Sequence, residues 1–389
     1  MHLLDERVEM RTYSIFWWHP ALVRLRIGLF SALSERYSIS FLFLAESTVS
    51  HIQRLVRDHP IARTADYCSD RGLITKRLLL YWISPQDLRK MCKGIGRSDL
   101  FVSSFVWNAY TIVGLVICKV LRKKVIVWDE TNGIRHSLVS SAKYAVIRLL
   151  CRHVDAFFVM GRVPEQALEW LGVPSEKIFV ANDYPARVFS ELEAKEVPRI
   201  QIDKGKPVVL YVGRLVEFKG VEYLIKAFGV VERQLQNAHL LVAGSGPLRP
   251  SLENLTARIG LKNCTFLGNV SDDEKVYLYS RSSMVVVPSI ITKKDSEGGN
   301  GPAVILEALS AGRPVITTTA AGSNADFVRN GVNGFVVAQR DASALAHSIK
   351  YLILNPVPSS QVLASFRQIE GVEFQVEQFE KAIAYVMRS

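Results

Sequence analysis

The sequence predicts an α/β protein made of two consecutive domains, each built on a parallel sheet with crossover helices. Three observations favour this fold class. The chain of 389 residues is longer than one hydrophobic core usually supports. Hydrophobic residues make up 49% of it, which is enough for two cores. Short apolar runs alternate with helical patterns in both halves of the chain, an arrangement typical of parallel sheets.

The first half contains a series of short apolar runs that we expect to be strands. They are Thr12–Trp17, Ile39–Leu44, Leu100–Phe105, Val125–Trp128, Ala156–Met160 and Ile178–Ala181. The stretch Leu100–Cys118 has nineteen residues without a charge, long enough to suggest a membrane span. Because Ser103, Asn108 and other polar residues interrupt it, we expect a strand, a turn and then a helix running to Lys124.

The periodicity stops between Pro185 and Pro207, so we predict a first domain over residues 1–185 and a linker over 186–207. A second domain is predicted over 208–370. Its expected strands are Val208–Val212, His239–Ala243, Cys264–Leu267, Met284–Pro288, Pro314–Thr318 and Gly334–Val337. Its expected helices are Val221–Leu235, Leu248–Ile259, Asp272–Ser280 and Pro302–Ser310. Ser271 and Glu274 form an S-x-x-E capping box that fixes the start of one of them.

The net charge of +11 is concentrated in the first half. Residues 1–185 carry 25 basic and 17 acidic side chains, and residues 51–150 alone carry 17 and 7. Such a surface attracts phosphates of nucleic acids, anionic lipids or lipid pyrophosphates. The five cysteines show no metal-ligand spacing, and the N-terminus does not resemble a secretory signal. We therefore expect a reduced, cytoplasmic protein without structural zinc.

The strongest local motif is VVLYVGRLVEFKG, in which the strand Val208–Val212 leads into Gly213 and Arg214 and then Lys219 before a helix. Gly213 lets the backbone approach a ligand, and the helix start offers free amides. Arg214 and Lys219 are spaced to hold one pyrophosphate between them. Alternatively, the motif is a solvated basic turn.

A second motif, DSEGGNGPAVILEALSAGRPVI, joins an acidic, glycine-rich loop to an amphipathic helix that carries Glu307. Glu307 stands where such a helix would otherwise place an apolar residue. A carboxylate there can accept two hydrogen bonds from the hydroxyls of a ribose. The alternative is an ordinary exposed helix glutamate.

Together these motifs resemble glycosyltransferase family 4, the retaining group of GT-B fold also called glycosyl transferases group 1. The resemblance is strongest from Val208 to Val337, where GSGP, FLGNVSDDE and AAGSNADFVRNGVNGFVV also match. In the first half it is carried by VDAFFVMG and GVPSEKIFVAND. It implies two Rossmann-like domains facing across a cleft: an acceptor-binding first domain and a nucleotide-sugar-binding second domain. Residues 371–389 are then expected to form a helix that packs back toward the first domain.

The resemblance also implies roles for individual residues. Arg214 and Lys219 would bind the donor diphosphate beside Gly213. Glu307 would bind the ribose, and Asn269 and Val270 would lie beside the nucleobase. The family places its first glutamate eight residues before the second, but Gly299 stands there. A two-residue insertion would put Glu297 against the donor sugar as a catalytic residue. The loop residues assigned to donor binding with it are Gly299, Asn300 and Gly301.

The first half departs further from the family pattern. Where relatives often have a Gly-Gly loop and a later histidine, this chain has WWHP at Trp17–Pro20 and WDETNG at Trp128–Gly133. His19, Asp129 and Glu130 are therefore candidates for the side of the site that faces the acceptor or the sugar, although a lone loop histidine is more often only solvated. The sequence contains no D-x-D cluster that is suited to binding a metal ion, and we expect no cofactor. The nucleotide sugar is a substrate.

Two other classes of protein are less compatible with the sequence. A nicotinamide-dependent oxidoreductase needs G-x-G-x-x-G after the first strand of a domain, whereas Gly244-Ser245-Gly246 lacks the third glycine and follows a second strand. A nucleic-acid-binding protein without transferase activity fits the high pI. A protein of that class would have basic residues interleaved with aromatic ones. In this chain the excess of basic residues lies apart from the glycine and carboxylate motifs.

A membrane surface is the remaining expected partner. The helical pattern Pro20–Tyr37 carries apolar residues beside Arg24 and Arg26 and follows Trp17 and Trp18. Further basic residues surround the apolar run Leu78–Ile83, namely Lys76, Arg77, Arg89, Lys90, Lys93 and Arg97. We predict that this half binds anionic lipid at the inner face of a membrane, with a lipid-linked saccharide as acceptor. The alternative is a helix that packs on its own sheet under a solvated basic face.

Overall fold

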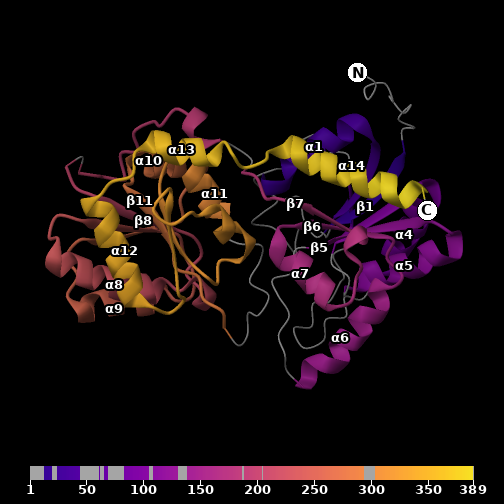
Figure 1. Ribbon diagram of the computed structural model, residues 1–389, viewed down its shortest axis with the longest axis horizontal. Helices are drawn as coiled ribbons and strands as arrows, with labels where there is room; N and C mark the ends of the chain where they lie inside the picture. The colour runs from indigo at the N-terminus through magenta and orange to yellow at the C-terminus, as the bar shows by residue number, and fades with distance from the viewer. Residues whose placement is uncertain are drawn as a thin grey trace.

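The predicted fold class is confirmed by a computed structural model, which folds into two α/β domains side by side (Figure 1). The structure describes residues 13–19, 24–43, 61, 65–68, 83–104, 108–129, 138–185, 188–203, 205–292 and 303–388. Both sheets are parallel throughout. The carboxyl ends of their strands therefore define one edge of each sheet, where ligands of such folds bind.

The N-terminal domain contains a seven-stranded sheet in the order β3-β2-β1-β4-β5-β6-β7. Its strands are β1 (Ser14–His19), β2 (Ser38–Phe43), β3 (Asp66–Tyr67), β4 (Leu100–Ser104), β5 (Lys124–Asp129), β6 (Ala156–Met160) and β7 (Ile178–Ala181). Side chains alternate along β1, so that Ile15 and Trp17 enter one core while Phe16 and Trp18 enter the other. The sheet is thus covered on both faces.

One face of this sheet is covered by α1 (Arg24–Arg36) and α14 (Val372–Arg388), the other by α4 (Pro85–Arg97), α5 (Ala109–Leu121), α6 (Leu138–Cys151) and α7 (Arg162–Trp170). The C-terminal helix α14 thus belongs to the N-terminal domain (Figure 1). Phe379 of α14 stacks on Trp17 with the ring centroids 5.0 Å apart. Arg36 of α1 pairs with Glu373 at 2.9 Å and Glu380 at 3.0 Å.

The C-terminal domain contains a six-stranded sheet in the order β10-β9-β8-β11-β12-β13. Its strands are β8 (Val208–Val212), β9 (His239–Ala243), β10 (Cys264–Gly268), β11 (Met284–Val287), β12 (Val315–Thr318) and β13 (Gly334–Val337). One face packs on α8 (Val221–Gln234), α9 (Arg249–Ile259) and α12 (Ala342–Leu354). The other packs on α10 (Asp272–Arg281), α11 (Ala303–Ser310) and α13 (Ser359–Phe366).

The sequence predicted this domain closely. The expected strands begin or end within one residue of the observed ones, and the Ser271–Glu274 capping box is present. The predicted linker is not a free connection, because Phe189 and Ile200 are buried in the core of the C-terminal domain. Short 3-10 turns, η2 (Ser175–Lys177), η3 (Phe189–Glu191), η4 (Glu217–Lys219) and η5 (Gly322–Phe327), connect the larger elements.

The uncharged stretch Leu100–Cys118 divides into β4 and α5, as predicted. Gly114 lets α5 lie close to the sheet, since a Cβ there would be 2.2 Å from the ring of Phe101. Among the described residues, none of the helices combines the length and the apolar character that crossing a membrane requires.

The described side chains near the first helix are not available to a membrane, and membrane binding by this half stays a prediction. Trp17 and Trp18 are buried within β1, and Leu29 and Phe30 of α1 are buried against the sheet and α14. The helix packs on its own sheet because α14 supplies a second apolar layer there. Lys76, Arg77 and the run 78–82 lie outside the described residues.

Candidate active site

Three neighbouring strands of the C-terminal sheet each lead into a glycine at the carboxyl edge. Gly213 follows β8, Gly244 follows β9, and Gly268 ends β10. The amide of Gly213 donates to the carbonyl of Ala243 at 2.9 Å, and that of Gly244 donates to Gly268 at 2.7 Å. A Cβ on Gly244 would be 1.8 Å from the carbonyl oxygen of Gly213. Only glycine fits there, and the edge stays open to a ligand that contacts backbone.

A basic turn follows Gly213. The guanidinium of Arg214 lies over the ring of Phe218 at 5.5 Å, and the Nζ of Lys219 lies over the same ring at 5.2 Å. Gly220 closes the turn with a φ of +64°, and a Cβ there would be 2.0 Å from the carbonyl oxygen of Pro288. Gly220 is therefore required by both its backbone conformation and its close contact with the end of β11.

The two cations of this turn lack a carboxylate partner within the described part of the chain, where no ion pair includes Arg214 or Lys219. Burial, and then the nearby Arg214, lower the pKa of Lys219 to about 8. Helix α8 begins directly after the turn without a side-chain cap at Gly220, so its first amides face the same region. This arrangement favours an anion.

Asn269 and Val270 lie next to this turn. The backbone amide of Leu215 donates to the carbonyl of Ser245 at 2.9 Å, and the Ser245 hydroxyl donates to Oδ1 of Asn269 at 2.6 Å. The structure thus brings Gly213, Arg214, Asn269 and Val270 to one edge, although they come from loops far apart in sequence.

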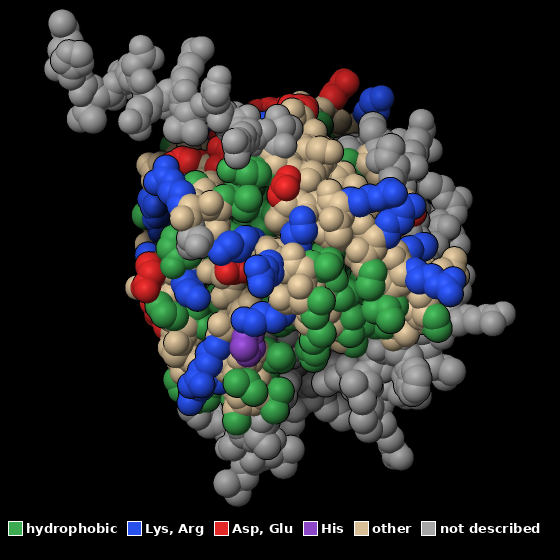
Figure 2. Space-filling model, turned by 90° about the vertical axis from the view of Figure 1, so that its right-hand side faces the viewer, with side chains coloured by type: hydrophobic (Ala, Val, Ile, Leu, Met, Phe, Trp, Pro, Cys, Tyr) green, Lys and Arg blue, Asp and Glu red, His purple; other side chains and the backbone are tan. Residues whose placement is uncertain are grey.

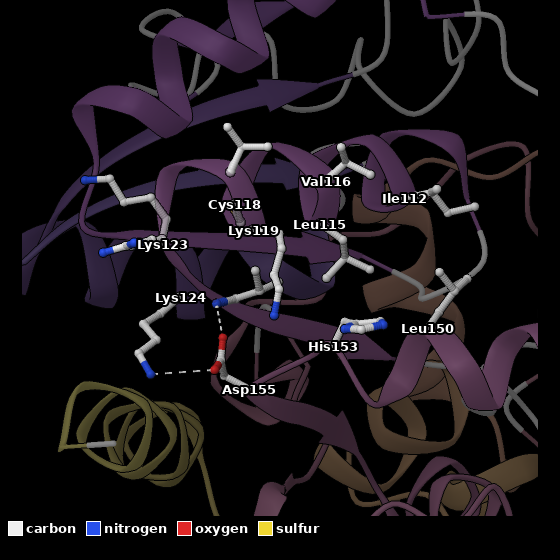
Figure 3. A pocket seen from close by; sticks show the side chains of 13 residues that line it. Ile112, Leu115, Val116, Cys118, Lys119, Lys123, Lys124, Leu150, His153 and Asp155 are labelled. Carbon is white, nitrogen blue, oxygen red and sulfur yellow. Dashed lines mark hydrogen bonds and ion pairs between the residues drawn. The ribbon is translucent and has the colours of Figure 1, made fainter.

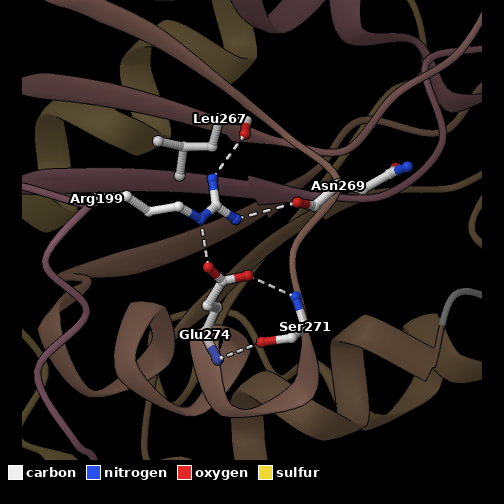
Figure 4. A network of polar contacts seen from close by, with 5 residues as sticks. All are labelled: Arg199, Leu267, Asn269, Ser271 and Glu274. Carbon is white, nitrogen blue, oxygen red and sulfur yellow. Dashed lines mark hydrogen bonds and ion pairs between the residues drawn. The ribbon is translucent and has the colours of Figure 1, made fainter.

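Arg199 holds the loop that carries Asn269 and Val270 (Figure 4). Its guanidinium donates to the carbonyl oxygens of Leu267 and Asn269, each at 3.1 Å, and to the carboxylate of Glu274. The other oxygen of Glu274 accepts from the amide of Ser271 at 2.7 Å. Bonding to Arg199 is the main reason that the pKa of Glu274 falls to about 2.

Glu307 lies in the second turn of α11, where it contacts α10. Its Oε2 accepts from the Tyr279 hydroxyl at 2.8 Å, and its Oε1 lies 3.5 Å from Nζ of Lys275. Burial and Glu307 raise the pKa of Tyr279 well above its usual value, so this hydroxyl remains a donor. Each carboxylate oxygen retains a second lone pair for a ligand hydroxyl. Because Lys275 lies in the first turn of α10, directly after the Asn269–Ser271 loop and residues 272–274, Glu307 is tied to the same end of α10.

The glycine-rich loop cannot be placed. Glu297, Gly299, Asn300 and Gly301 lie outside the described residues, between Thr292 and Ala303. Glu130 lies outside them as well. The predictions made for these residues stay predictions.

Asp129 and His19 end β5 and β1 at the carboxyl edge of the other sheet. Both are buried, and the ring of His19 packs edge to face on Phe30 at 5.5 Å and Trp128 at 5.7 Å. His19 is therefore a strand residue among aromatic rings, and the solvated loop histidine weighed from the sequence is not observed.

Among the described residues, the carboxyl edges of the two sheets meet where α7 contacts η5. The backbone amide of Val163, just after β6, donates to the hydroxyl of Ser323, just after β12, at 3.2 Å. Gly161 has a φ of +88°, and a Cβ there would be 2.3 Å from Cβ of Ser323. This contact brings the carboxyl edges of the two sheets, which carry the described candidate residues, toward each other. In the described ranges, no group of three or more His, Cys, Asp or Glu side chains could hold a metal ion.

Comparisons with known proteins agree with this arrangement. Residues 193–367 match the family model described as glycosyl transferases group 1. The chain is 34% identical over 270 residues to the capsular polysaccharide biosynthesis glycosyltransferase CapM of Staphylococcus aureus, covering 64% of this chain and 67% of CapM. It is 31% identical over 230 residues to the alpha-D-kanosaminyltransferase of Streptomyces kanamyceticus, covering 59% of this chain and 54% of that one.

The aligned parts cover between 36% and 60% of the length of four curated relatives, which include the kanosaminyltransferase. Solved structures match over nearly the whole chain. The crystal structure of HepE from Anabaena in complex with UDP has a TM-score of 0.75 at 18% identity, covering 96% of this chain and 99% of that one. At this identity the likeness establishes the fold.

Proposed function

The chain belongs to the glycosyl transferases group 1 family, and from this premise we propose that it transfers a sugar from a nucleoside-diphosphate sugar to a saccharide or lipid-linked saccharide. The setting is synthesis of a cell-surface polysaccharide or lipopolysaccharide. The name of CapM, a glycosyltransferase of capsular polysaccharide biosynthesis, supports this setting. The enzyme works in the cytoplasm, peripherally bound at the inner face of a membrane.

One observation carries the proposal. Arg214 and Lys219 both lie over the ring of Phe218 without a carboxylate partner among the described residues, and the lowered pKa of Lys219 reflects its burial and then its repulsion from Arg214. Two cations kept together in this way need an anion with more than one charge. A donor diphosphate supplies it, and the uncapped amides at the start of α8 add to the attraction.

Transfer requires stabilisation of the charge that develops on the leaving diphosphate. Arg214, Lys219 and the α8 amides are fixed before the reaction, so they stabilise this charge with little reorganisation. In this proposal Glu307 binds the ribose, Asn269 and Val270 lie beside the base, and Glu297 contacts the sugar. His19, Asp129 and Glu130 face the sugar or the acceptor. In this proposal the transferred sugar keeps its anomeric configuration, and the reaction needs no metal ion.

Donor use tests the function directly. We expect slow hydrolysis of one member of a panel of nucleotide sugars by the purified protein, and Arg214→Ala or Lys219→Ala to lower turnover by on the order of a hundredfold or more. Lys226→Ala is the matched control, because its Nζ lies 5.2 Å over Tyr223 and pairs with Glu222 on the exposed side of α8. Near-normal turnover in both turn variants would refute the diphosphate role.

The finer points need separate measurements. The anomeric configuration of the product, read by NMR, tests retention, and turnover in the presence of a chelator tests independence of a metal ion. Inversion, or loss of turnover that Mg²⁺ restores, would contradict the respective point without affecting the family assignment.

A further inference from the structure

A groove of about 680 Å³ opens between α5 and α6 on the N-terminal domain (Figure 3). It is lined by α5 from Ile112 onward, the start of β5 and the end of α6. Since β5 starts here, the groove lies at the amino end of the sheet, away from the cleft. The candidate active site leaves this groove unexplained.

The rim of the groove is basic. Among the described lining residues, the basic ones are Lys119, Arg122, Lys123, Lys124 and His153, and the one acid is Asp155. Asp155 accepts from the amide of Val125 at 2.8 Å and pairs with Lys124 at 3.7 Å. Within the described ranges no ion pair engages Lys119, Arg122 or Lys123. The net charge around the opening is therefore positive.

Large apolar side chains are exposed beside these cations. Val116 and Val120 of α5 are 60% and 75% exposed, and Val146 and Leu149 of α6 are 56% and 54% exposed. Of the eleven exposed large hydrophobic side chains in the described part of the chain, six lie on α4, α5 and α6. Figure 2 shows hydrophobic and basic side chains next to one another at this end of the molecule. A solvated helix face would not concentrate apolar groups in this way.

From this combination we infer that the α5–α6 face, defined by Val116, Lys119, Val120, Lys123, Val146 and Leu149, docks on an anionic lipid bilayer. The branched apolar side chains enter the interface while the lysines meet lipid phosphates. A second copy of the chain is a poor occupant, because a symmetric contact would bring the cations of two faces together. Nucleic acid is also disfavoured, since the described residues that line the groove include no aromatic side chain.

The position of the α5–α6 face would bring the acceptor side of the N-terminal domain to the bilayer. This part of the inference rests on the proposed function. Helix α5 starts next to the carboxyl end of β4, on the cleft side, and ends at the groove. A bilayer that lies along the exposed side of α5 therefore reaches the edge of the N-terminal domain where an acceptor enters. The acceptor would then be a saccharide on a lipid anchor, presented from the same bilayer.

Vesicle co-sedimentation tests the docking surface. We expect the protein to bind phosphatidylcholine vesicles that contain phosphatidylglycerol, with binding that falls with added salt, and to bind pure phosphatidylcholine weakly. Lys119→Glu with Lys123→Glu should weaken binding by about fivefold or more per lysine. Val116→Gln with Val120→Gln should weaken it without changing its salt dependence. Val116, Lys119 and Val120 are exposed and Lys123 is half-buried, so thermal unfolding should stay near that of the wild type.

Arg258→Glu with Lys262→Glu, two exposed cations of the C-terminal domain, is the matched control and should bind vesicles as the wild type does. Undiminished binding of the α5–α6 variants, or no vesicle binding at all, would overturn the inference. So would stronger competition by inorganic phosphate than by sodium chloride at the same ionic strength, or a shift of a nucleic acid probe that the lysine variants abolish. Donor hydrolysis without vesicles reports separately on the proposed function, and it should be unchanged in the α5–α6 variants.

Discussion

Lys219, for which we propose a role in donor binding, reduces the stability of the unliganded fold. Its Nζ is partly buried beside Arg214, and its pKa is lowered from 10.5 to about 8. Between these two pH values the unfolded chain binds the proton and the folded chain does not. The free energy of unfolding therefore rises with pH from about 8 to about 10.5, and at neutral pH the full cost of the charge is present.

We therefore predict that Lys219→Met stabilises the unliganded protein at pH 7, by about 1 kcal/mol after allowance for solvent screening, while it lowers turnover. The gain should disappear above pH about 10.5, where the wild-type lysine is neutral in both states. Urea unfolding at a series of pH values measures it. Lys226→Met, at a solvent-exposed lysine paired with Glu222, should give no such gain. Equal or lower stability of Lys219→Met at pH 7 would contradict the electrostatic account.

Glu307 is held by Tyr279 and Lys275 of α10, and we predict that it contributes to donor binding. Glu307→Gln keeps the shape but removes the charge, so we expect the donor Kd to rise by about tenfold or more, with kcat nearly unchanged. Tyr279→Phe removes only the hydroxyl that orients the carboxylate and should have a smaller effect in the same direction. Titration calorimetry with the donor nucleotide measures both. An unchanged Kd in Glu307→Gln would remove Glu307 from the donor site.

At the scale of the element, the start of α10 is stabilised in two ways. The Ser271–Glu274 capping box satisfies its first amides, and Arg199 binds the same glutamate from a segment more than 70 residues earlier. The pKa of Glu274 is lowered from 4.5 to about 2. Its ionised form thus contributes stability above pH about 4.5, and this contribution is lost as the pH falls toward 2.

We predict that Arg199→Met lowers the free energy of unfolding by about 1 kcal/mol at neutral pH, and that the difference from the wild type shrinks as the pH falls from 4.5 toward 2. Glu274→Gln is the control: its amide oxygen can still cap the helix, so its stability should change less with pH. Donor binding should also weaken in Arg199→Met, because the Leu267–Asn269 backbone loses two donors. A stability difference that is constant with pH would argue against the Arg199–Glu274 pair.

The same elements show how far sequence reasoning reaches. Strands such as Val208–Val212 were predictable because buried parallel strands are continuous apolar runs that end at glycine. The capping box was predictable because it is local. The role of Arg199 was not predictable, because it binds backbone carbonyls, and such contacts cannot be recognised from the residue types in a sequence. The buried Trp17 and Trp18 were misjudged because the helix that covers Trp17, α14, lies more than 350 residues away.

At the scale of the whole molecule, two features join the domains. Helix α14 carries the chain back to the N-terminal domain, and its Gln375 donates to the carbonyl of Asn182 near the point where the chain first leaves that domain. The second feature is the contact of Gly161 and Val163 with Ser323 at the cleft. The return of the C-terminal helix was implied by the family resemblance. The Gly161–Ser323 contact was not visible as a motif, because it consists of backbone groups and small side chains brought together only by the fold.

The Gly161–Ser323 contact leads to the last prediction. Gly161→Ala introduces a Cβ that would lie 2.3 Å from Cβ of Ser323, so we expect it to hold the two carboxyl edges apart and to lower kcat/KM by on the order of tenfold or more. Gly172→Ala is the matched control, because Gly172 has a similar φ of +82° and no atom within 4 Å of the added Cβ. Both variants carry the same backbone strain, and only Gly161→Ala disturbs the cleft. Small-angle scattering should accordingly show a larger radius of gyration for Gly161→Ala alone. If the two variants lose activity equally, with no change in dimensions, the domain contact has no part in transfer.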